Sequence, residues 1–416
     1  HESFRTVNLT SFYYVIPFAS APMLSAMLQG RSAAVLMAVA SAAMAGILLP
    51  EQVHFSMVAL AGGVMAAIRW KDYRRRSAIL LAGLMVGLLS LALALGFNMQ
   101  EGLRTATERW PDLPMALLGG IATMIVVSAA LPLFESMFKL TTDMRLLELA
   151  DQNHPLLRQL VVQVPGTYHH SLLVGNLAEE AAESIGANPL LTRVGAYFHD
   201  IGKILKPEYF IENQGAVNRH DRLNPSMSAL ILISHVKEGV EMGRSHKLPK
   251  EIINLIKQHH GTTLIRFFYD KAQKAGGDGA EIPEEAYRYP GPRPQTREAG
   301  ILMLADMVEA TSRTLQDPSP ARLAGMVERA VQMAFADGQF DECDLTLRDL
   351  GGIQESFLRV LAGMYHHRVG YPDPKTSERK GSGESVHIKP AKAGAARSPG
   401  LAPAGRGGPR GAPVEG

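Results

Sequence analysis

Residues 197–203 have the sequence Tyr-Phe-His-Asp-Ile-Gly-Lys. This stretch places His199 directly before Asp200 and puts Lys203 three residues further along the chain. Imidazole and carboxylate side chains are common ligands of transition metals, and a lysine ammonium suits a phosphate group. Of the 14 histidines in the chain, nine lie between His154 and His260. Solvent-facing histidines do not usually cluster in this way, so the surroundings of the stretch indicate a metal site.

Two different compositions meet in the chain. Residues 1–139 are rich in Ala, Leu, Met, Val and Gly, whereas the sequence after them is typical of a soluble protein. The net charge of +2 gives no reason to expect a nucleic acid polymer as a partner. The single cysteine, Cys343, excludes an internal disulfide and fits a reducing compartment. Because the chain begins at His1 and not at Met, we expect it to be a fragment or a processed chain that lacks an N-terminal part of the full protein.

Apolar stretches in residues 1–139 predict a transmembrane region. A spanning helix needs about 20 mostly apolar residues. Five stretches are candidates, of which the third is short: 10–29, 33–50, 53–68, 77–98 and 112–138. The stretch at 77–98 has no polar face, which argues against a buried helix of a soluble protein. We therefore predict a multi-helix bundle of about five spans in a lipid bilayer.

Basic residues in the loops predict the orientation, because lysine and arginine collect on the cytoplasmic side of a membrane protein. Five of them crowd the third connection: Arg69, Lys71, Arg74, Arg75 and Arg76. This connection should be cytoplasmic. Two of the five predicted spans follow it, so the chain crosses out and back, and the C-terminal half is then cytoplasmic as well. We expect a multi-pass protein of the inner (plasma) membrane. The spans contain no chain of carboxylates, which disfavours a transporter.

The sequence after residue 139 has helical periodicity almost throughout and predicts an all-α soluble domain. Residues 140–164 are predicted to form a juxtamembrane connecting helix, which Pro155 and Pro165 interrupt. Residues 165–372 are predicted to form the soluble bundle, and 373–416 a disordered basic tail. The candidate helices of the bundle are 168–186, 189–199, 225–243, 249–260, 295–316, 320–336 and 346–366.

Potential metal ligands lie on several of these predicted helices. Each has an ordinary alternative: His235 lies in an apolar run and could be a core residue, and His259 and His260 end a helix, where a cation is favourable. Asp306 stands between apolar residues, where a carboxylate is costly unless it is paired or binds a metal. Asp200 has two oxygens and could bridge two ions, which together would clamp a phosphate and acidify a water molecule. The full set is His170, His199, Asp200, His235, His259, His260 and Asp306.

The sequence resembles the HD superfamily of metal-dependent phosphohydrolases. More narrowly, it resembles the membrane-anchored HD phosphodiesterases of the PgpH type, the seven-transmembrane HD family that hydrolyses cyclic di-AMP. The resemblance covers the chain to about Pro372. It rests on phrases such as Pro-Gly-Thr-Tyr-His-His-Ser at 165–171, Tyr-Phe-Ile-Glu-Asn-Gln at 209–214, Gln-His-His-Gly-Thr-Thr at 258–263, Tyr-Pro-Gly-Pro at 289–292 and Met-Leu-Ala-Asp at 303–306, besides the stretch at 196–203.

Carried over residue by residue, the resemblance implies a site for two divalent ions, Mn or Fe. The first ion would be held by His170, His199, Asp200 and Asp306, and the second by Asp200, His235, His259 and His260. His169 is the alternative to His170. We prefer His170 because the family's ligand precedes a serine, as His170 does, and stands four residues before Val174. Asp200 and Lys203 would be the catalytic residues, with Lys203 on the substrate phosphate.

Two other classes within the superfamily are less compatible with the sequence. The class with a Gly-Tyr-Pro signature needs it shortly after the histidine pair, whereas here it lies at 370–372, over a hundred residues after 259–260. We interpret 366–372 as the end of the last helix. A hydrolase with one metal would not need His235, His259 and His260.

The substrate contacts are less defined. Asn213, in the loop 212–214, and Arg293, in the loop 289–293, are candidates for holding a dinucleotide, although both loops could be ordinary surface loops. Taken together with the metal-ligand set, the resemblance implies a phosphodiesterase that opens cyclic di-AMP to pApA. The alternatives are a receptor that senses a cyclic dinucleotide without turnover, and an HD enzyme acting on cyclic di-GMP or another nucleotide. Assembly as a homodimer is left open.

Overall fold

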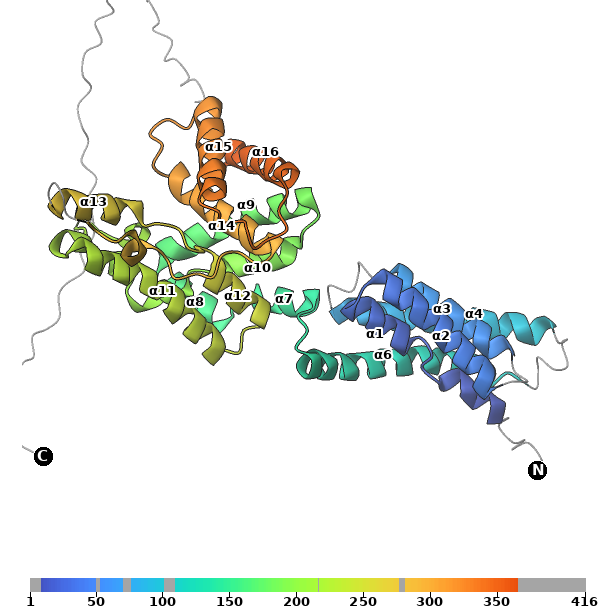
Figure 1. Ribbon diagram of the computed structural model, residues 1–416. Helices are drawn as coiled ribbons and strands as arrows, with labels where there is room; N and C mark the ends of the chain where they lie inside the picture. Colours follow the sequence, from blue (N-terminus) through green and yellow to red (C-terminus); the bar gives the residue numbers. More distant parts are fainter. Residues whose placement is uncertain are drawn as a thin grey trace, which may run out of the picture. The chain divides into compact units, whose positions relative to one another are not determined.

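The computed structural model describes residues 9–49, 53–69, 76–100, 109–215, 217–276 and 281–365. Within these ranges the chain is helical, and one isolated bridge, between Leu264 and Arg288, is the sole β-pairing (Figure 1). The prediction of an all-α protein is therefore confirmed. The predicted helix end at 366–372 and the predicted disordered tail at 373–416 lie outside the described residues.

Apolar helices make up the N-terminal region. They are η1 (Leu9–Val15), α1 (Ser20–Leu28), α2 (Arg31–Leu48), α3 (Val53–Ile68), α4 (Arg76–Gln100) and α6 (Asp112–Phe138). Four segments are long and apolar enough to cross a membrane: Thr10–Leu28, Arg31–Leu48, Arg76–Gln100 and Asp112–Phe138. Helix α3 is apolar but has only 16 residues. The region thus has the helices of a membrane protein, and the number of about five spans stays a prediction.

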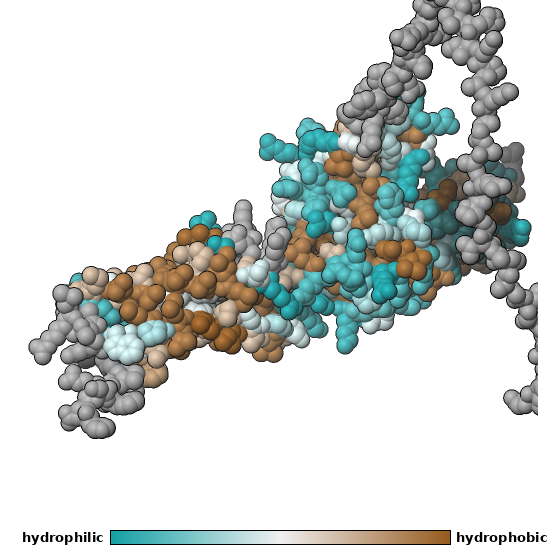
Figure 2. All heavy atoms as spheres, turned by 180° about the vertical axis from the view of Figure 1, so that it is seen from behind, coloured by the Kyte–Doolittle hydropathy of each residue, from teal (hydrophilic) through white to brown (hydrophobic). Residues whose placement is uncertain are grey.

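The surface of this region is apolar, as expected for contact with lipid. Figure 2 shows hydrophobic side chains covering most of the visible face of these helices. Large apolar side chains such as Leu36 on α2, Leu84 on α4 and Leu133 on α6 are exposed. Exposed apolar area on this scale is unfavourable in water, so the surface supports burial in a bilayer.

Helices α4 and α6 pack closely and antiparallel through small residues. A Cβ at Gly83 would lie 2.8 Å from Cβ of Met124, and a Cβ at Gly87 would lie 3.2 Å from the carbonyl oxygen of Leu117. Small residues let two helix backbones approach where lipid supplies no hydrophobic driving force. The antiparallel pairing brings the first turn of α4 and the last turn of α6 to the same end of the pair.

The soluble region contains helices whose starts follow local rules. Proline occupies the first position of α8, α9, α10, α11 and α15, where its missing N–H costs nothing. The helices are α7 (Asp143–Leu149), α8 (Pro155–Gln163), α9 (Pro165–Ile185), α10 (Pro189–Phe198), α11 (Pro225–Ser245), α12 (Lys250–Gln258), α13 (Arg266–Gly276), α14 (Arg297–Ser312), α15 (Pro320–Ala336) and α16 (Leu347–Met364). Short 3-10 helices are η3 (Ile201–Leu205), η4 (Pro207–Tyr209), η5 (Ile211–Asn213), η6 (Arg219–Arg222) and η7 (Glu284–Tyr287).

Helices α8 and α13 were not predicted as separate helices, and α9 begins three residues earlier than predicted. Pro155 and Pro165 were interpreted as interruptions of one connecting helix, whereas each begins a new helix, α8 and α9. Helix α13 was missed because its first turn is aromatic, which lowers helix propensity, and because Phe268 and Ala272 are the only buried residues among positions 266–275. The predicted helix at 249–260 ends earlier, at Gln258, so that His259 and His260 lie in the turn after α12.

Helix α14 lies at the centre of the soluble region. Its residues 299–306 are all buried, and α9, α10, α12 and α15 all contact it. A helix that is buried on all sides leaves no solvent-facing position for a charge. Two carboxylates nevertheless occur on it, Asp306 and Glu309, and both are buried. The free-energy cost of burying these two carboxylates is offset by the histidines around them.

Candidate metal centre

The structure brings together all seven residues that were predicted as metal ligands. His170 comes from α9, His199 ends α10, Asp200 precedes η3, His235 comes from α11, His259 and His260 follow α12, and Asp306 comes from α14. Their ligand atoms form two adjacent groups, each within 4.8 Å: His170, His199 and Asp306, and Asp200, His235, His259 and His260. The neighbouring His169 is exposed, whereas His170 is buried.

Asp200 lies between the two groups and presents one oxygen to each. Its Oδ2 is 3.1 Å from Nε2 of His199 and 3.5 Å from Nε2 of His170. Its Oδ1 is 3.3 Å from Nε2 of His235 and 3.7 Å from Nε2 of His259. A carboxylate in this position can bridge two ions, because each of its oxygens faces a different set of imidazoles.

Asp306 also faces both groups. Its Oδ1 is 3.0 Å from Nε2 of His170, and its Oδ2 is 3.5 Å from Nδ1 of His260. The ring of His260 stacks on Tyr289, with centroids 4.2 Å apart. His260 is 22% exposed, whereas the other four histidines are buried. The side of the cluster at His260 is therefore the open one.

Hydrogen bonds on the far side of each ring orient the histidines. Nδ1 of His199 lies 2.7 Å from the carbonyl oxygen of Ala196, and Nδ1 of His259 lies 2.7 Å from that of Ile256. Nδ1 of His235 makes the same kind of contact with Leu232. A proton held at Nδ1 leaves the lone pair on Nε2, which is the form that binds a metal. The local helical geometry thus directs three Nε2 atoms into the cluster.

Unsatisfied buried atoms test whether the cluster suits a metal. Nε2 of His199 and Oδ1 of Asp200 are buried and make no hydrogen bond of good geometry to a described residue, whereas Oδ2 of Asp200 has the Lys203 ammonium at 2.6 Å. Buried polar atoms without a partner are rare and costly. The donor set is nitrogen and oxygen, which suits Mn, Fe or Zn. The cluster therefore fits one or two divalent transition metals.

The electrostatics of the metal-free cluster keep its carboxylates ionised. Burial would raise the pKa of Asp200, but His199 and Lys203 outweigh burial and hold this pKa well below its usual range. Burial would lower the pKa of His199, but Asp200 and Asp306 raise it to about 10. Burial lowers the pKa of His260 to about 3. Asp200 is thus anionic and His260 neutral, as metal ligands must be, whereas His199 carries a proton that it would release on binding a cation.

Lys203 lies beside the cluster between two carboxylates. Its Nζ is 2.6 Å from Oδ2 of Asp200 and 2.8 Å from Oε1 of Glu212. It also lies over the ring of Phe210, 5.0 Å from the centroid. Burial would lower the pKa of Lys203, but Asp200 and Glu212 raise it above the ordinary value, so the ammonium is charged.

The two candidates for substrate contact make other contacts. The Asn213 amide oxygen accepts from the backbone N–H of Thr167 at 3.2 Å, and its nitrogen donates to Oγ1 of Thr167. The Arg293 guanidinium pairs with Asp341 at 2.8 Å. Both side chains thus support neighbouring loops, and a role in substrate binding stays a prediction.

Sequence reasoning missed Glu309 and did not assign roles to Glu212 and Tyr289. Glu309 stands three residues after Asp306, a spacing that puts both on one face of a helix. That spacing was the available signal. For Glu212 and Tyr289 the signal was weaker, because their contacts with Lys203 and His260 lie 9 and 29 residues away and follow no helical spacing.

Comparisons with known proteins agree with this architecture. Residues 3–142 match the family model "7TM receptor with intracellular HD hydrolase", and residues 167–311 match the HD domain. Over 89% of its length the chain is 41% identical to the cyclic-di-AMP phosphodiesterase PgpH of Listeria monocytogenes. It is 39% identical, again over 89%, to the PgpH of Bacillus subtilis. The chain covers 52% and 53% of these two proteins, and thus spans about half the length of the curated relatives that it matches.

A solved structure matches the soluble region. It is the crystal structure of the HD domain of L. monocytogenes phosphodiesterase PgpH in complex with cyclic di-AMP. The match has 45% sequence identity and a TM-score of 0.50, and it covers 52% of this chain and 100% of the other.

Proposed function

The chain belongs to the family of membrane proteins that join a transmembrane helical region to an HD domain. We propose that it is a metal-dependent phosphodiesterase that hydrolyses cyclic di-AMP to pApA. The names of the relatives support this substrate, since two are cyclic-di-AMP phosphodiesterases. A related HD domain has also been crystallised with cyclic di-AMP.

The position of Asp200 carries the proposal. Its two oxygens face two sets of imidazoles, a geometry that an ordinary buried ion pair does not require. The first ion would be held by His170, His199, Asp200 and Asp306, and the second by Asp200, His235, His259 and His260. We propose Mn or Fe as the ions. When bound, such a pair supplies positive charge at the phosphate and acidifies a water nucleophile.

Side chains of the protein contribute binding and orientation. Lys203 has a second carboxylate partner, Glu212, at 2.8 Å, so its ammonium stays in place when Asp200 engages a metal. From there it can donate to a phosphate oxygen and neutralise charge that develops during the reaction. The open side at His260 and Tyr289 gives the substrate access, while the buried histidines exclude bulk water.

A hydrolysis assay tests the proposal. The full chain in lipid nanodiscs, loaded with Mn, should convert cyclic di-AMP to pApA, as measured by chromatography of the products. Asp200→Asn should abolish turnover, because the amide cannot bridge two cations. His169→Asn is the matched control and should keep activity, whereas His170→Asn should lose it. Full activity of Asp200→Asn would reject the mechanism.

The same assay separates the alternatives from this proposal. A receptor would bind cyclic di-AMP but give no product with Mn, Fe or Zn. An enzyme for cyclic di-GMP would hydrolyse that substrate faster when both dinucleotides compete in one reaction. Light scattering of the same sample would test the homodimer, which stays a prediction.

We further propose that the HD domain lies in the cytoplasm and that the protein is in the inner membrane. The support is the excess of basic residues at 69–76. In a Cys343→Ser background, the exposed position of Glu342 can carry a single introduced cysteine, Glu342→Cys. An impermeant maleimide should label it only after the inner membrane is permeabilised. Labelling in intact spheroplasts would reverse the proposed orientation.

A further inference from the structure

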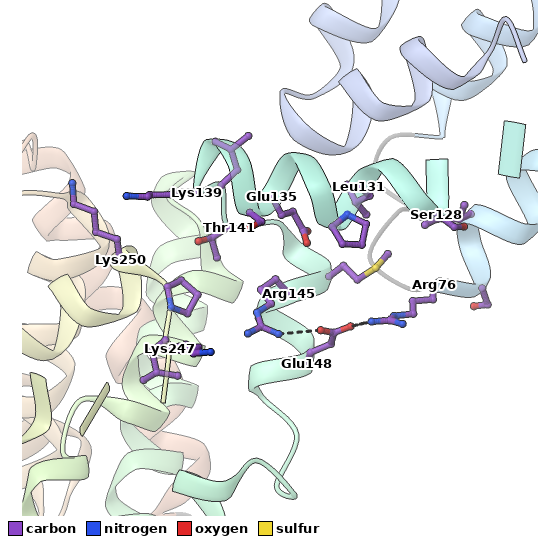
Figure 3. A pocket seen from close by; sticks show the side chains of 18 of the residues that line it. Arg76, Ser128, Leu131, Glu135, Lys139, Thr141, Arg145, Glu148, Lys247 and Lys250 are labelled. Carbon is purple, nitrogen blue, oxygen red and sulfur yellow. Dashed lines mark hydrogen bonds and ion pairs between the residues drawn. The ribbon is translucent and has the colours of Figure 1, made fainter. Parts of the chain in front are cut away.

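A cavity of about 870 Å³ lies at the end of the α4–α6 pair (Figure 3), and none of the seven candidate metal ligands lines it. Its lining is of two kinds. Apolar side chains from the membrane helices, among them Leu80 and Leu131, form one part. Basic side chains from four places in the chain form another: Arg76, Lys139, Arg145, Lys247 and Lys250.

The acidic residues of the lining do not neutralise all of these cations. Figure 3 shows Glu148 between Arg76 and Arg145, and their nitrogens lie 2.6 Å and 3.4 Å from its carboxylate oxygens. The other acidic residue, Glu135, accepts a hydrogen bond from the Thr142 hydroxyl. Among the described residues, no side-chain acceptor pairs with the ammonium groups of the three remaining cations, which are Lys139, Lys247 and Lys250.

The backbone at two of these lysines is unusual. Lys139, which ends α6, has φ of 53°, and Lys247, two residues after α11, has φ of 55°. These are the two non-glycine residues with positive φ in the part of the chain that the structure describes. Glycine is the favoured residue at such a helix end, because a Cβ is disfavoured there. Both positions thus carry a cation where local folding preferences favour glycine.

The place of the cavity indicates the ligand. Arg76 begins α4 and Lys139 follows α6, and both helices are long and apolar enough to span a membrane. If α4 and α6 span the bilayer, this end of the helix pair meets the lipid headgroups. A phosphate needs cations with free donors, and an acyl chain needs an apolar wall such as Leu80 and Leu131.

We propose that this cavity binds the headgroup of an anionic phospholipid, with the phosphate on Lys139, Lys247 and Lys250 and the start of an acyl chain against the apolar wall. The lipid would contact α7, which packs against α10, the helix directly before His199. The proposal does not depend on the phosphodiesterase activity, because binding is measured without turnover.

Lipid binding to the delipidated full chain in detergent tests the proposal by native mass spectrometry. Phosphatidylglycerol should bind, and phosphatidylcholine should bind much less. The double variant Lys139→Gly/Lys247→Gly should bind phosphatidylglycerol roughly thirtyfold more weakly, since each lysine at an anionic lipid surface contributes a factor of about five. Glycine suits both backbone positions, so the variant should unfold at the same temperature or higher.

The control is Lys237→Gln/Lys274→Gln, which removes the same charge from exposed positions that do not line the cavity. It should bind like the parent protein. Equal binding by both double variants, or equal binding of phosphatidylcholine and phosphatidylglycerol, would overturn the site. Soluble glycerol 3-phosphate is a further arm: if it displaces the lipid at equal concentration, the site recognises a free phosphate and the lipid assignment is wrong.

Discussion

Oε2 of Glu309 lies 2.5 Å from Nδ1 of His170, inside the soluble region. Glu309 is 1% exposed, and its other oxygen accepts from Nε of Arg313 at 2.6 Å. The carboxylate therefore holds the His170 ring with Nε2 directed toward Asp306. The other buried histidines of the cluster use backbone carbonyls for this purpose, so His170 is the one oriented by a charged group from outside the seven ligands.

Glu309→Gln should weaken metal binding. The amide keeps the shape of the side chain but loses the negative charge that makes the His170 ring more basic. Loss of such a supporting group typically lowers metal affinity by about tenfold to a hundredfold. Competition with a fluorescent chelator would measure the Mn affinity. The same substitution at Glu328, an exposed position on α15, is the control and should leave the affinity unchanged. An unchanged affinity in Glu309→Gln would show that Glu309 only packs.

Removal of metal should lower the thermal stability of the soluble region. Without ions, Nε2 of His199 and Oδ1 of Asp200 stay buried without good hydrogen bonds. A ligand that binds only the folded state stabilises it by about 2.7 kcal/mol when present at about 100 times its dissociation constant. Differential scanning calorimetry with Mn and with EDTA would measure the shift. Identical melting temperatures in both conditions would contradict a metal site in this cluster.

The histidine cluster and the family resemblance allowed the ligand set to be predicted, whereas the local sequence at each position left an ordinary alternative open. His235 is an example of a residue whose local sequence pointed to a different role. Its apolar neighbours in the sequence suggested a core residue, whereas its Nε2 faces Asp200 at 3.3 Å. The choice between these two interpretations came from the whole set of histidines and from the family resemblance.

Contacts between distant loops could not be predicted in the same way. Asn213 bonds to Thr167, 46 residues away, and Arg293 bonds to Asp341, 48 residues away. Polar residues in loops have many potential partners, and only the tertiary fold selects one. The same holds for the cavity at Lys139 and Lys247, which no local pattern indicates.

Acid should remove the stabilisation that Asp337 provides. Partial burial would raise the pKa of Asp337, but hydrogen bonds from Arg288 and Gln339 outweigh burial and hold this pKa below its usual value. Arg288 also donates to the carbonyl oxygen of Thr262, in the turn after His260. A carboxyl group with a lowered pKa stabilises the fold above its unfolded pKa, and this contribution is lost as the pH falls through the folded pKa.

Asp337→Asn should therefore melt at a lower temperature than the parent protein at neutral pH. The difference should begin to narrow below about pH 4, where the carboxyl group is protonated in the unfolded state, and should narrow further as the pH falls through the lower folded pKa. Thermal unfolding over a pH series would measure this. Asp344→Asn, at an exposed position, is the control. A difference that stays constant down to about pH 3 would show that the charge of Asp337 is not the cause.

The backbone of η3 passes so close to α11 that position 202, two residues after Asp200, has no room for a side chain. Replacement of Gly202 is therefore the sharpest test of the site. A Cβ at Gly202 would lie 1.9 Å from the carbonyl oxygen of His235, so Gly202→Ala must push η3 away from α11. This shift would separate Asp200 from His235. We expect weaker Mn binding and destabilisation by about 1–3 kcal/mol, as for other overpacked sites. At Gly351 of α16 a Cβ meets nothing within 4 Å, so Gly351→Ala should be as stable as the parent or more so. If both variants bound Mn and unfolded alike, the close approach of η3 to α11 would not be what positions Asp200.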